Sequence, residues 1–157
     1  MSMKLESPAF RHGEVVPRRF TADGRNSSPA LAWSGTPQNA RELVLIVDDP
    51  DAPGREPWVH WVVYKIPTVT AGLPEGVPSG PTPPEPVGVF QGRNSWGQLG
   101  FGGPAPPKGH GVHHYHFKLF ALDAPLEVFH GLNQAQLSDA MRGHVLEQTE
   151  LVGTYSR

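Results

Sequence analysis

Residues 42–48 read Glu-Leu-Val-Leu-Ile-Val-Asp, a continuous apolar run between two acidic residues. A short run of this kind, rich in Val, Leu and Ile, is typical of a strand that is buried on both faces. We therefore expect residues 42–48 to form a buried strand of a β-sheet.

An acidic, proline-containing stretch follows this run directly, with the sequence Asp-Asp-Pro-Asp-Ala-Pro at residues 48–53. Pro50 and Pro53 cannot extend a central ladder, so the chain must turn where the strand ends. Such a turn projects the carboxylates of Asp49 and Asp51 beyond the packed core, where they could reach a ligand. The alternative is that these Asp and Pro residues only form the turn.

A second apolar strand is predicted at residues 58–66, which read Trp-Val-His-Trp-Val-Val-Tyr-Lys-Ile. Strict alternation along a strand divides its side chains between two faces. One face would carry His60, Val62, Tyr64 and Ile66, and the other would carry Trp61, Val63 and Lys65. Trp58 could form the wall of a pocket beside His60, although either residue alone would also fit a packed core.

A third strand is predicted at residues 112–122. One face would carry His113, Tyr115, Phe117 and Leu119, and the opposite face His114, His116, Lys118 and Phe120. Two polar rings at the end of an apolar face indicate the mouth of a pocket, although His113 alone would also fit a hydrogen-bonded core histidine. Gly109 and Gly111 permit unusual backbone angles before the strand and leave amide groups free to face a ligand.

The remaining segments give fewer signals. Residues 67–111 show no clear helix, and a connection of this length is usually functional or disordered. The Pro-rich residues 78–86 are the candidate for disorder, whereas residues 91–97 are expected to be ordered. One helix is predicted from a capping box at Asn133 and Gln136, with Leu137, Met141 and Val145 on one face. Residues 149–156 are expected to form a closing strand.

The composition excludes several classes of protein. The chain has no Cys, which excludes disulfides and thiolate chemistry, and its net charge of −2 without a basic run argues against nucleic-acid binding. It contains 18 Gly and 18 Pro among 157 residues, too many for a helical bundle but suited to short strands joined by ordered loops. The length predicts a single domain, residues 1–157.

The sequence gives no sign of a membrane or export signal. No stretch approaches the length of a membrane span, and the first eight residues lack the apolar run of a signal peptide. We therefore expect a cytoplasmic protein without stable membrane insertion.

Three motifs occur in a fixed order along the chain: Asp-Pro-Asp-Ala-Pro at 49–53, Trp-Val-His at 58–60 and Pro-Pro-Lys-Gly-His-Gly-Val-His-His-Tyr at 106–115. In this order they resemble the phosphatidylethanolamine-binding protein family, in its bacterial Raf-kinase-inhibitor-like branch. Residues 26–33, 94–97 and 100–104 extend the resemblance to most of the chain. Two positions depart from it, because His114 stands where many relatives have Arg and Ala105 where bacterial relatives often have Cys.

The resemblance implies a mostly-β sandwich, with a large sheet packed on a smaller one and a few peripheral helices. It also implies a small anion pocket at one end of the sandwich, with Asp49, Asp51, His60, His113 and Tyr115 as ligand-binding residues. Trp58, Gly103 and Pro106 would form the rim. Cis peptide bonds are implied at Ala52-Pro53 and Glu56-Pro57, where proline reduces the preference for trans to about 0.5–1 kcal/mol.

The ligand implied by the resemblance is a small oxyanion, most simply a phosphate ester with a phosphoethanolamine-type head group, bound without a cofactor. If an imidazolium is one of the donors, binding should weaken above about pH 6.5. An Asp in such a pocket could fix a histidine tautomer or receive the ammonium of a zwitterion. A homodimer and a regulated protein partner of the kinase type are implied by analogy with relatives alone.

Two alternatives to a binding protein remain open. The same Asp, His and Tyr side chains could perform acid–base catalysis, although the chain has neither a Cys nor a Gly-x-Ser-x-Gly nucleophile. His114 and His116, two residues apart on one strand face, could bind a metal together with His110 and an acidic residue. We favour a solvent-facing or structural role for His114 and His116, and a protein that is not an enzyme.

Overall fold

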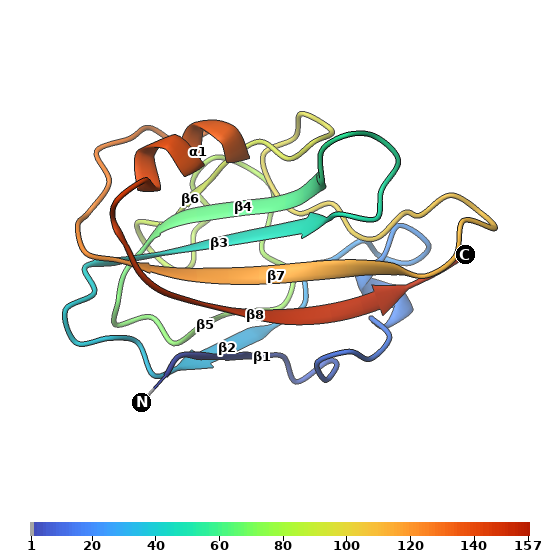
Figure 1. Cartoon of the computed structure of the whole chain (residues 1–157), viewed down its shortest axis with the longest axis horizontal. Helices are drawn as coiled ribbons and strands as arrows, with labels where there is room; N and C mark the ends of the chain where they lie inside the picture. The colour runs from blue at the N-terminus through green and yellow to red at the C-terminus, as the bar shows by residue number, and fades with distance from the viewer. Residues whose placement is uncertain (1) are drawn as a thin grey trace.

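Two antiparallel β-sheets face one another in the computed structural model, which describes residues 2–157 (Figure 1). The larger sheet has the strand order β6-β4-β3-β7-β8, and the smaller sheet has the order β1-β2-β5. In that order, the strands of the larger sheet are Phe90–Gln91, Trp58–Ile66, Glu42–Asp49, His113–Leu122 and Val145–Tyr155. Those of the smaller sheet are Lys4–Glu6, Leu31–Ser34 and Gly72–Leu73.

The predicted mostly-β fold, with a large sheet packed on a smaller one, is confirmed. The helical content is lower than expected. Within residues 2–157, one α-helix, α1 (Gln134–Met141), and a 3₁₀ turn at Arg18–Phe20 take the place of the few peripheral helices.

Strand β3 lies at the centre of the larger sheet, paired with β4 along one edge and with β7 along the other. All eight of its residues are buried, as the apolar run at 42–48 predicts. Leu43, Leu45 and Val47 face the space between the sheets, whereas Val44 and Ile46 pack on the opposite face with residues of α1.

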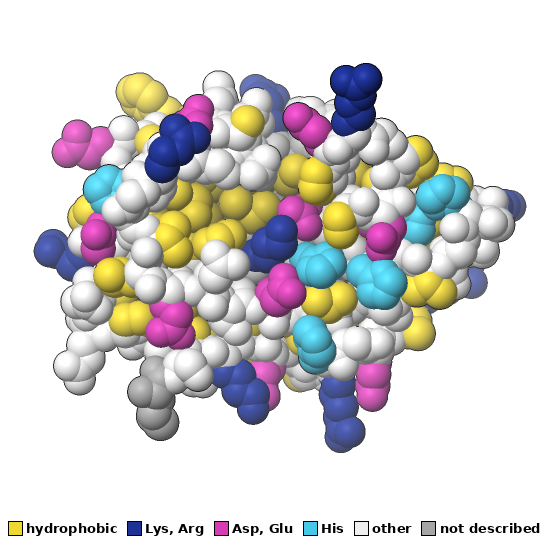
Figure 2. Space-filling model, in the orientation of Figure 1, with side chains coloured by type: hydrophobic (Ala, Val, Ile, Leu, Met, Phe, Trp, Pro, Cys, Tyr) yellow, Lys and Arg dark blue, Asp and Glu magenta, His cyan; other side chains and the backbone are white. Residues whose placement is uncertain are grey.

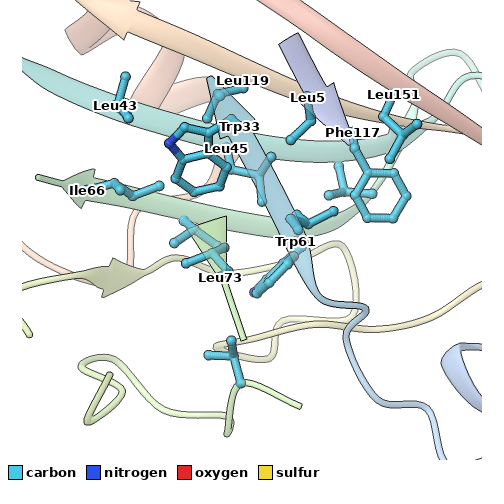
Figure 3. Close-up of a cluster of buried hydrophobic side chains, with 14 of the residues drawn as sticks. Leu5, Trp33, Leu43, Leu45, Trp61, Ile66, Leu73, Phe117, Leu119 and Leu151 are labelled. Atoms are coloured by element: carbon cyan, nitrogen blue, oxygen red, sulfur yellow. The ribbon is translucent and has the colours of Figure 1, made fainter. Parts of the chain in front are cut away.

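Apolar side chains from both sheets fill the space between them. Leu5 and Trp33 of the smaller sheet point toward Leu45, Trp61 and Leu119 of the larger one (Figure 3). Burying this apolar surface is the main favourable contribution to folding. This packing fixes which face of the larger sheet points inward. Asp49, His113 and Tyr115 lie on that inward face, near one end of the sheet.

Strand β4 departs from the predicted alternation at two places. Val47 pairs with Trp61 but Asp48 pairs with Val59, so β4 carries one extra residue, His60, at this point. A second irregularity occurs near Lys65, which has a φ of 58°. Each extra residue shifts the alternation by one, because two residues of one strand then oppose one of the other.

These bulges correct the face assignment made from the sequence. Ile66 lies with Trp61 and Val63 in the core between the sheets, whereas Val62 and Tyr64 belong to the cluster beneath α1. The prediction that His60 and Ile66 share a face with Val62 and Tyr64 is therefore wrong. Strict alternation fails here because the backbone inserts residues that the partner strand does not match.

The capping box of α1 is confirmed, but the helix is shorter than predicted. The Asn133 side chain accepts a hydrogen bond from the Gln136 amide at 2.9 Å, and the Gln136 side chain accepts one from the Asn133 amide at 3.0 Å. Leu137 and Met141 are buried as expected. The helix ends at Met141 because Gly143 adopts a φ of 82°, a conformation typical of helix ends.

Val145, predicted on the helix, is instead the first residue of β8. It pairs with Leu122 at the far end of β7. The closing strand predicted at 149–156 therefore begins four residues earlier, at 145, and ends at Tyr155.

The Pro-rich residues 78–86 form bends whose first part is tied to the larger sheet. The Gln91 side-chain amide donates to the carbonyls of Pro78 and Gly80, each at 2.9 Å, and the Gln91 backbone amide donates to Pro81 at 2.8 Å. One buried glutamine thus holds this stretch in place.

The expected positions of the cis peptide bonds are wrong. Among the described residues, the cis bond lies at Glu85-Pro86, whereas Ala52-Pro53 and Glu56-Pro57 are trans. Proline lowers the free-energy difference between the isomers without requiring cis, and trans remains the more favourable form by about 0.5–1 kcal/mol.

The described helices are too short to span a membrane. In the part of the chain that the structure describes, no helix has both the length and the apolar character that crossing a bilayer requires.

Replacing Asn133 tests the contribution of the capping box. We expect Asn133→Ala to lower the free energy of unfolding by about 1 kcal/mol, because the Gln136 amide loses its acceptor. Urea denaturation measures this change. Asn133→Ser, which keeps an oxygen acceptor, should lose much less; equal losses in the two variants would contradict the assignment.

Candidate functional site

A cavity of about 280 Å³ opens at the end of the larger sheet where β3 and β4 meet the start of β7. Its walls combine polar side chains of these strands with apolar residues from the β3–β4 loop and from the connection between β6 and β7. The lining residues are Asp49, Ala52, Pro53, Trp58, His60, Trp96, Ala105, Pro106, Pro107, His113 and Tyr115. Six of the eight residues predicted from the sequence as ligand-binding lie in this wall: Asp49, Trp58, His60, Pro106, His113 and Tyr115.

Asp49 and His113 form a buried pair inside the cavity wall. Asp49 Oδ2 and His113 Nδ1 lie 2.6 Å apart, and both side chains are almost fully buried. Since an ionised carboxylate only accepts hydrogen bonds, the proton of this bond is on His113 Nδ1. The carboxylate therefore fixes both the orientation and the tautomer of the imidazole ring.

The other nitrogen of His113 meets a second imidazole. His113 Nε2 lies 2.6 Å from His110 Nδ1, so one proton is shared between the two rings. The glycines on either side of His110 allow this contact, since Gly109 and Gly111 have φ values of 74° and 95° and turn the loop back toward β7. Asp49, His113 and His110 thus form a continuous hydrogen-bonded chain that leads from the wall to the protein surface.

His60 presents a hydrogen-bond acceptor to the cavity. Its Nδ1 lies 2.6 Å from the carbonyl oxygen of Gly102, and because a carbonyl can only accept, Nδ1 carries the proton. Burial lowers the pKa of His60 below its usual value, so the ring is neutral at pH 7 and Nε2 has a free lone pair. The edges of Trp96 and Tyr115 pack against the ring, each with a centroid distance of 5.1 Å.

Tyr115 is buried, with 1% of its surface exposed, and within residues 2–157 its hydroxyl has no hydrogen-bond partner. Burial, together with the negative charge of Asp49, raises the pKa of Tyr115 well above its usual value. The phenol is therefore a neutral donor. An unpartnered buried hydroxyl costs about 1–3 kcal/mol, and a ligand that accepts its proton would remove this cost.

Asp51 and Gly103, the other two residues predicted from the sequence, are not among those that line the cavity. Asp51 Oδ2 accepts hydrogen bonds from the backbone amide and the Nδ1 of His114, at 2.8 Å and 2.7 Å, on the outer side of the sheet. Although burial opposes it, these bonds lower the pKa of Asp51. Alternation explains the difference, since His114 faces away from its neighbours His113 and Tyr115.

Gly103 supports the loop rather than the cavity surface. Its amide donates to Asn26 Oδ1 at 2.6 Å, and a Cβ atom at this position would lie 2.4 Å from the carbonyl oxygen of Phe20. The residue packs against the segment that begins with the 3₁₀ turn, and this close approach requires a glycine.

Sequence reasoning missed part of the wall, above all Trp96, and it did not predict that His110 would bond His113. Trp96 packs edge-on against Trp58 at 5.5 Å between ring centroids, and it covers His60 from the same side. The aromatic residue in the ordered stretch 91–97 was the available signal for Trp96. The Gly-His-Gly sequence at 109–111 was the signal for His110.

The residues proposed as an alternative metal site, His114 and His116, bind two different carboxylates. His114 Nδ1 bonds Asp51, and His116 Nδ1 bonds Glu150 at 3.1 Å, so the two imidazoles serve separate carboxylates. Across residues 2–157, no three His, Asp or Glu side chains are grouped closely enough to hold an ion.

Comparison with known proteins decides the family. The chain matches the phosphatidylethanolamine-binding protein family over residues 6–156. It belongs to that family. The resemblance deduced from the three motifs is thereby confirmed, and the cavity lies where the family motifs meet.

Relatives within this family cover the whole chain. A UPF0098 protein of Pyrococcus horikoshii is 45% identical over 157 residues, which is 100% of this chain and 78% of the relative. A UPF0098 protein of Methanothermobacter thermautotrophicus is 45% identical over 99% of both chains.

Solved structures of the family agree with the fold. YbcL of E. coli, a member of the mammalian PEBP family, is 31% identical with a TM-score of 0.92, covering 100% of this chain and 99% of its own. A phosphatidylethanolamine-binding protein homolog from Chlamydia trachomatis is 38% identical with a TM-score of 0.88, covering 99% and 98%.

The burial of His60 predicts a specific dependence of stability on pH. Its folded pKa lies below the unfolded value of about 6.5, so between these two values the unfolded state binds more protons. The contribution is fully present above about pH 6.5 and is lost as the pH falls through the folded pKa.

Urea midpoints measured from pH 7.5 down to 5 should therefore decline, and His60→Gln should flatten that decline because it removes the titrating group. His144→Gln, at an exposed surface pair with Asp123, is the matched control and should keep the wild-type slope. The same slope in all three proteins would rule out the buried, neutral His60.

Proposed function

We propose that the cavity binds a small phosphate monoester, with phosphoethanolamine as the type of head group. The observation that carries the proposal is the unpartnered hydroxyl of Tyr115, buried in the wall beside an imidazole whose orientation Asp49 fixes. A phosphate oxygen is an acceptor that fits this donor.

The carboxylate of Asp49 does not prevent an anion from binding. Its Oδ2 accepts from His113 Nδ1 at 2.6 Å, and its Oδ1 accepts from the Asp51 amide at 2.8 Å. Both oxygens are thus engaged with donors, which offsets the negative charge that an incoming phosphate meets.

The neutral His60 favours a ligand that also carries a proton donor. Its Nε2 lone pair can accept from the P–OH of a singly ionised phosphate ester or from an ammonium group. The indole rings of Trp58 and Trp96 complete an apolar wall on this side, and an ammonium group is attracted to such ring faces. Phosphoethanolamine provides a phosphate oxygen, a P–OH and an ammonium group in one molecule.

The size of the cavity favours a head group over an intact lipid. A volume of about 280 Å³ is at the lower end for small-molecule sites, and acyl chains would have to lie outside it. The wall contains no Ser, Thr, Cys or Lys side chain that could act as a nucleophile. Binding is therefore better supported than catalysis.

Replacing Tyr115 separates stability from binding. We expect Tyr115→Phe to keep or slightly raise the free energy of unfolding, because it removes a buried hydroxyl that has no partner. The same change should weaken phosphoethanolamine binding by at least about tenfold, since the donor to the phosphate is lost.

Tyr64→Phe is the matched control for Tyr115→Phe. The Tyr64 hydroxyl donates to the Phe129 carbonyl and accepts from the Leu132 amide, so its loss should destabilise the protein by about 1 kcal/mol and leave binding unchanged. Urea denaturation and calorimetric titration measure the two effects. A clear loss of stability in Tyr115→Phe would mean that its hydroxyl already has a structural partner.

Histidine side-chain NMR tests the ligand directly. Titration with phosphoethanolamine should produce saturable shifts of the His60 and His113 ring signals, and His113→Ala should abolish the His60 shifts. His144→Ala, remote from the cavity, should leave them unchanged. An absence of shifts at millimolar phosphoethanolamine would rule out the head-group proposal, and equal shifts with ethanolamine would show that the phosphate is not recognised.

A further inference from the structure

The outer face of the larger sheet carries charged side chains in pairs, each with one acidic and one basic member. Figure 2 shows acidic, basic and histidine side chains side by side on this face. The pairs are Asp51–His114, Glu150–His116 and Asp48–Lys118. A different arrangement lies beside the cavity, where two arginine side chains bond a single residue, Asp23.

Asp23 holds the guanidinium of Arg157 in one orientation. Arg157 Nε lies 3.1 Å from each carboxylate oxygen of Asp23, and Nη2 lies 2.9 Å from Oδ1. The Tyr155 hydroxyl also donates to Asp23 Oδ2, at 2.7 Å. The hydrogen bonds from Arg157 and Tyr155 lower the pKa of Asp23, so the ion pair persists at neutral pH.

The neighbouring segment of the cavity wall, residues 104–107, depends on donors from elsewhere in the chain. It reads Pro-Ala-Pro-Pro, so three of its four residues have no backbone N–H, and it belongs to no strand. Its carbonyl groups must therefore accept from other segments. The Pro104 carbonyl accepts from the Ala22 amide at 2.9 Å, which leaves the part of the segment nearer the cavity to be held by another donor.

Arg157 is the donor for that part. Its Nη1 lies 3.4 Å from the carbonyl oxygen of Pro106, a long hydrogen bond, and Pro106 lines the cavity. Among residues 2–157, no other Lys or Arg side chain bonds a residue of the cavity wall. The Gly109 amide also donates to the Arg157 carbonyl, at 3.3 Å. Residue 157 thus fastens this loop at two points.

The charge of Arg157 also reaches the groups inside the wall. Burial and the charge of Asp49 raise the pKa of the Tyr115 phenol, and the positive charge of Arg157 opposes them. Within the described residues, the wall contains the carboxylate of Asp49 but no Lys or Arg side chain. A cation directly behind Pro106 therefore makes the cavity more favourable for an anion.

We propose that Arg157, held in place by Asp23, is a positioning residue for the phosphate ligand. It fastens the wall through the Pro106 carbonyl, and it places a positive charge behind that wall. This inference rests on the proposed binding of a phosphate monoester, because the charge assists only an anionic ligand.

Two variants at position 157 separate the charge from the planar donor group. We expect Arg157→Gln to weaken phosphoethanolamine binding about tenfold, because it removes both, and Arg157→Lys to weaken it about threefold, because it keeps the charge. Arg142→Gln, at an exposed arginine paired with Asp139 just after α1, is the matched control and should have no effect. Calorimetric titration of the full chain measures the affinities.

The salt dependence of binding distinguishes this role from a purely structural one. The affinity of the wild-type protein for phosphoethanolamine should fall as the salt concentration rises. This slope should be smaller in Arg157→Gln and retained in Arg157→Lys, because ions screen only the charge. A substitution that merely loosened the wall would lower the affinity without changing the slope, and that result would overturn the role of the charge.

Amide NMR of the ligand-free protein tests the fastening of the wall by itself. Arg157→Gln should shift the Ala105, Lys108 and Gly109 amides, whereas Arg142→Gln should leave them unchanged. Unshifted amides would overturn the positioning role, as would equal phosphoethanolamine affinities of the wild type and Arg157→Gln. A wild-type protein that binds no phosphoethanolamine would refute the proposed function and with it the role of the charge, and the amide shifts would still decide whether Arg157 holds the wall.

Discussion

The pairing of β3 along both of its edges is the constraint on which the rest of the structure depends. A strand that is buried on both faces and bonded on both sides cannot shift by one residue without exposing its apolar face to solvent. Its last two residues are therefore placed with little freedom. Asp49 faces inward to the cavity, and Asp48 faces outward, on the side of the sheet against which α1 packs.

The acidic residues at the end of β3 are each matched by a basic residue of β7. Asp48 bonds Lys118, Asp49 bonds His113 and Asp51 bonds His114. The first and third of these pairs lie outside the sandwich, whereas the second is buried. The same short acidic stretch thus ties two strands together on both faces, and of its three carboxylates only that of Asp49 lines the cavity.

Much of this arrangement could be predicted from the sequence. The apolar run at 42–48, the prolines after it and the alternation of β7 give the central strand, the turn and the inward positions of His113 and Tyr115. Periodicity could not reveal the extra residues of β4, because a bulge depends on how two strands pair. Nor could it place Asp51 outside, since side-chain directions within a turn follow from backbone angles. Trp96 reaches the cavity from a loop whose path is set by contacts distant in sequence, such as the hydrogen bonds between its neighbour Ser95 and Val59.

The bulge at His60 also determines how this site could be transferred to another protein. Because β4 has one residue more than β3 at this point, Trp58 and His60 face the cavity while Val59 packs beneath α1. A designer who copied the side chains onto a regular hairpin would turn both rings to the wrong face, although every residue type was correct. The number of residues in β4 is thus as important to the site as their identity. A relative that lacks one residue within 58–61 would present different side chains to its cavity.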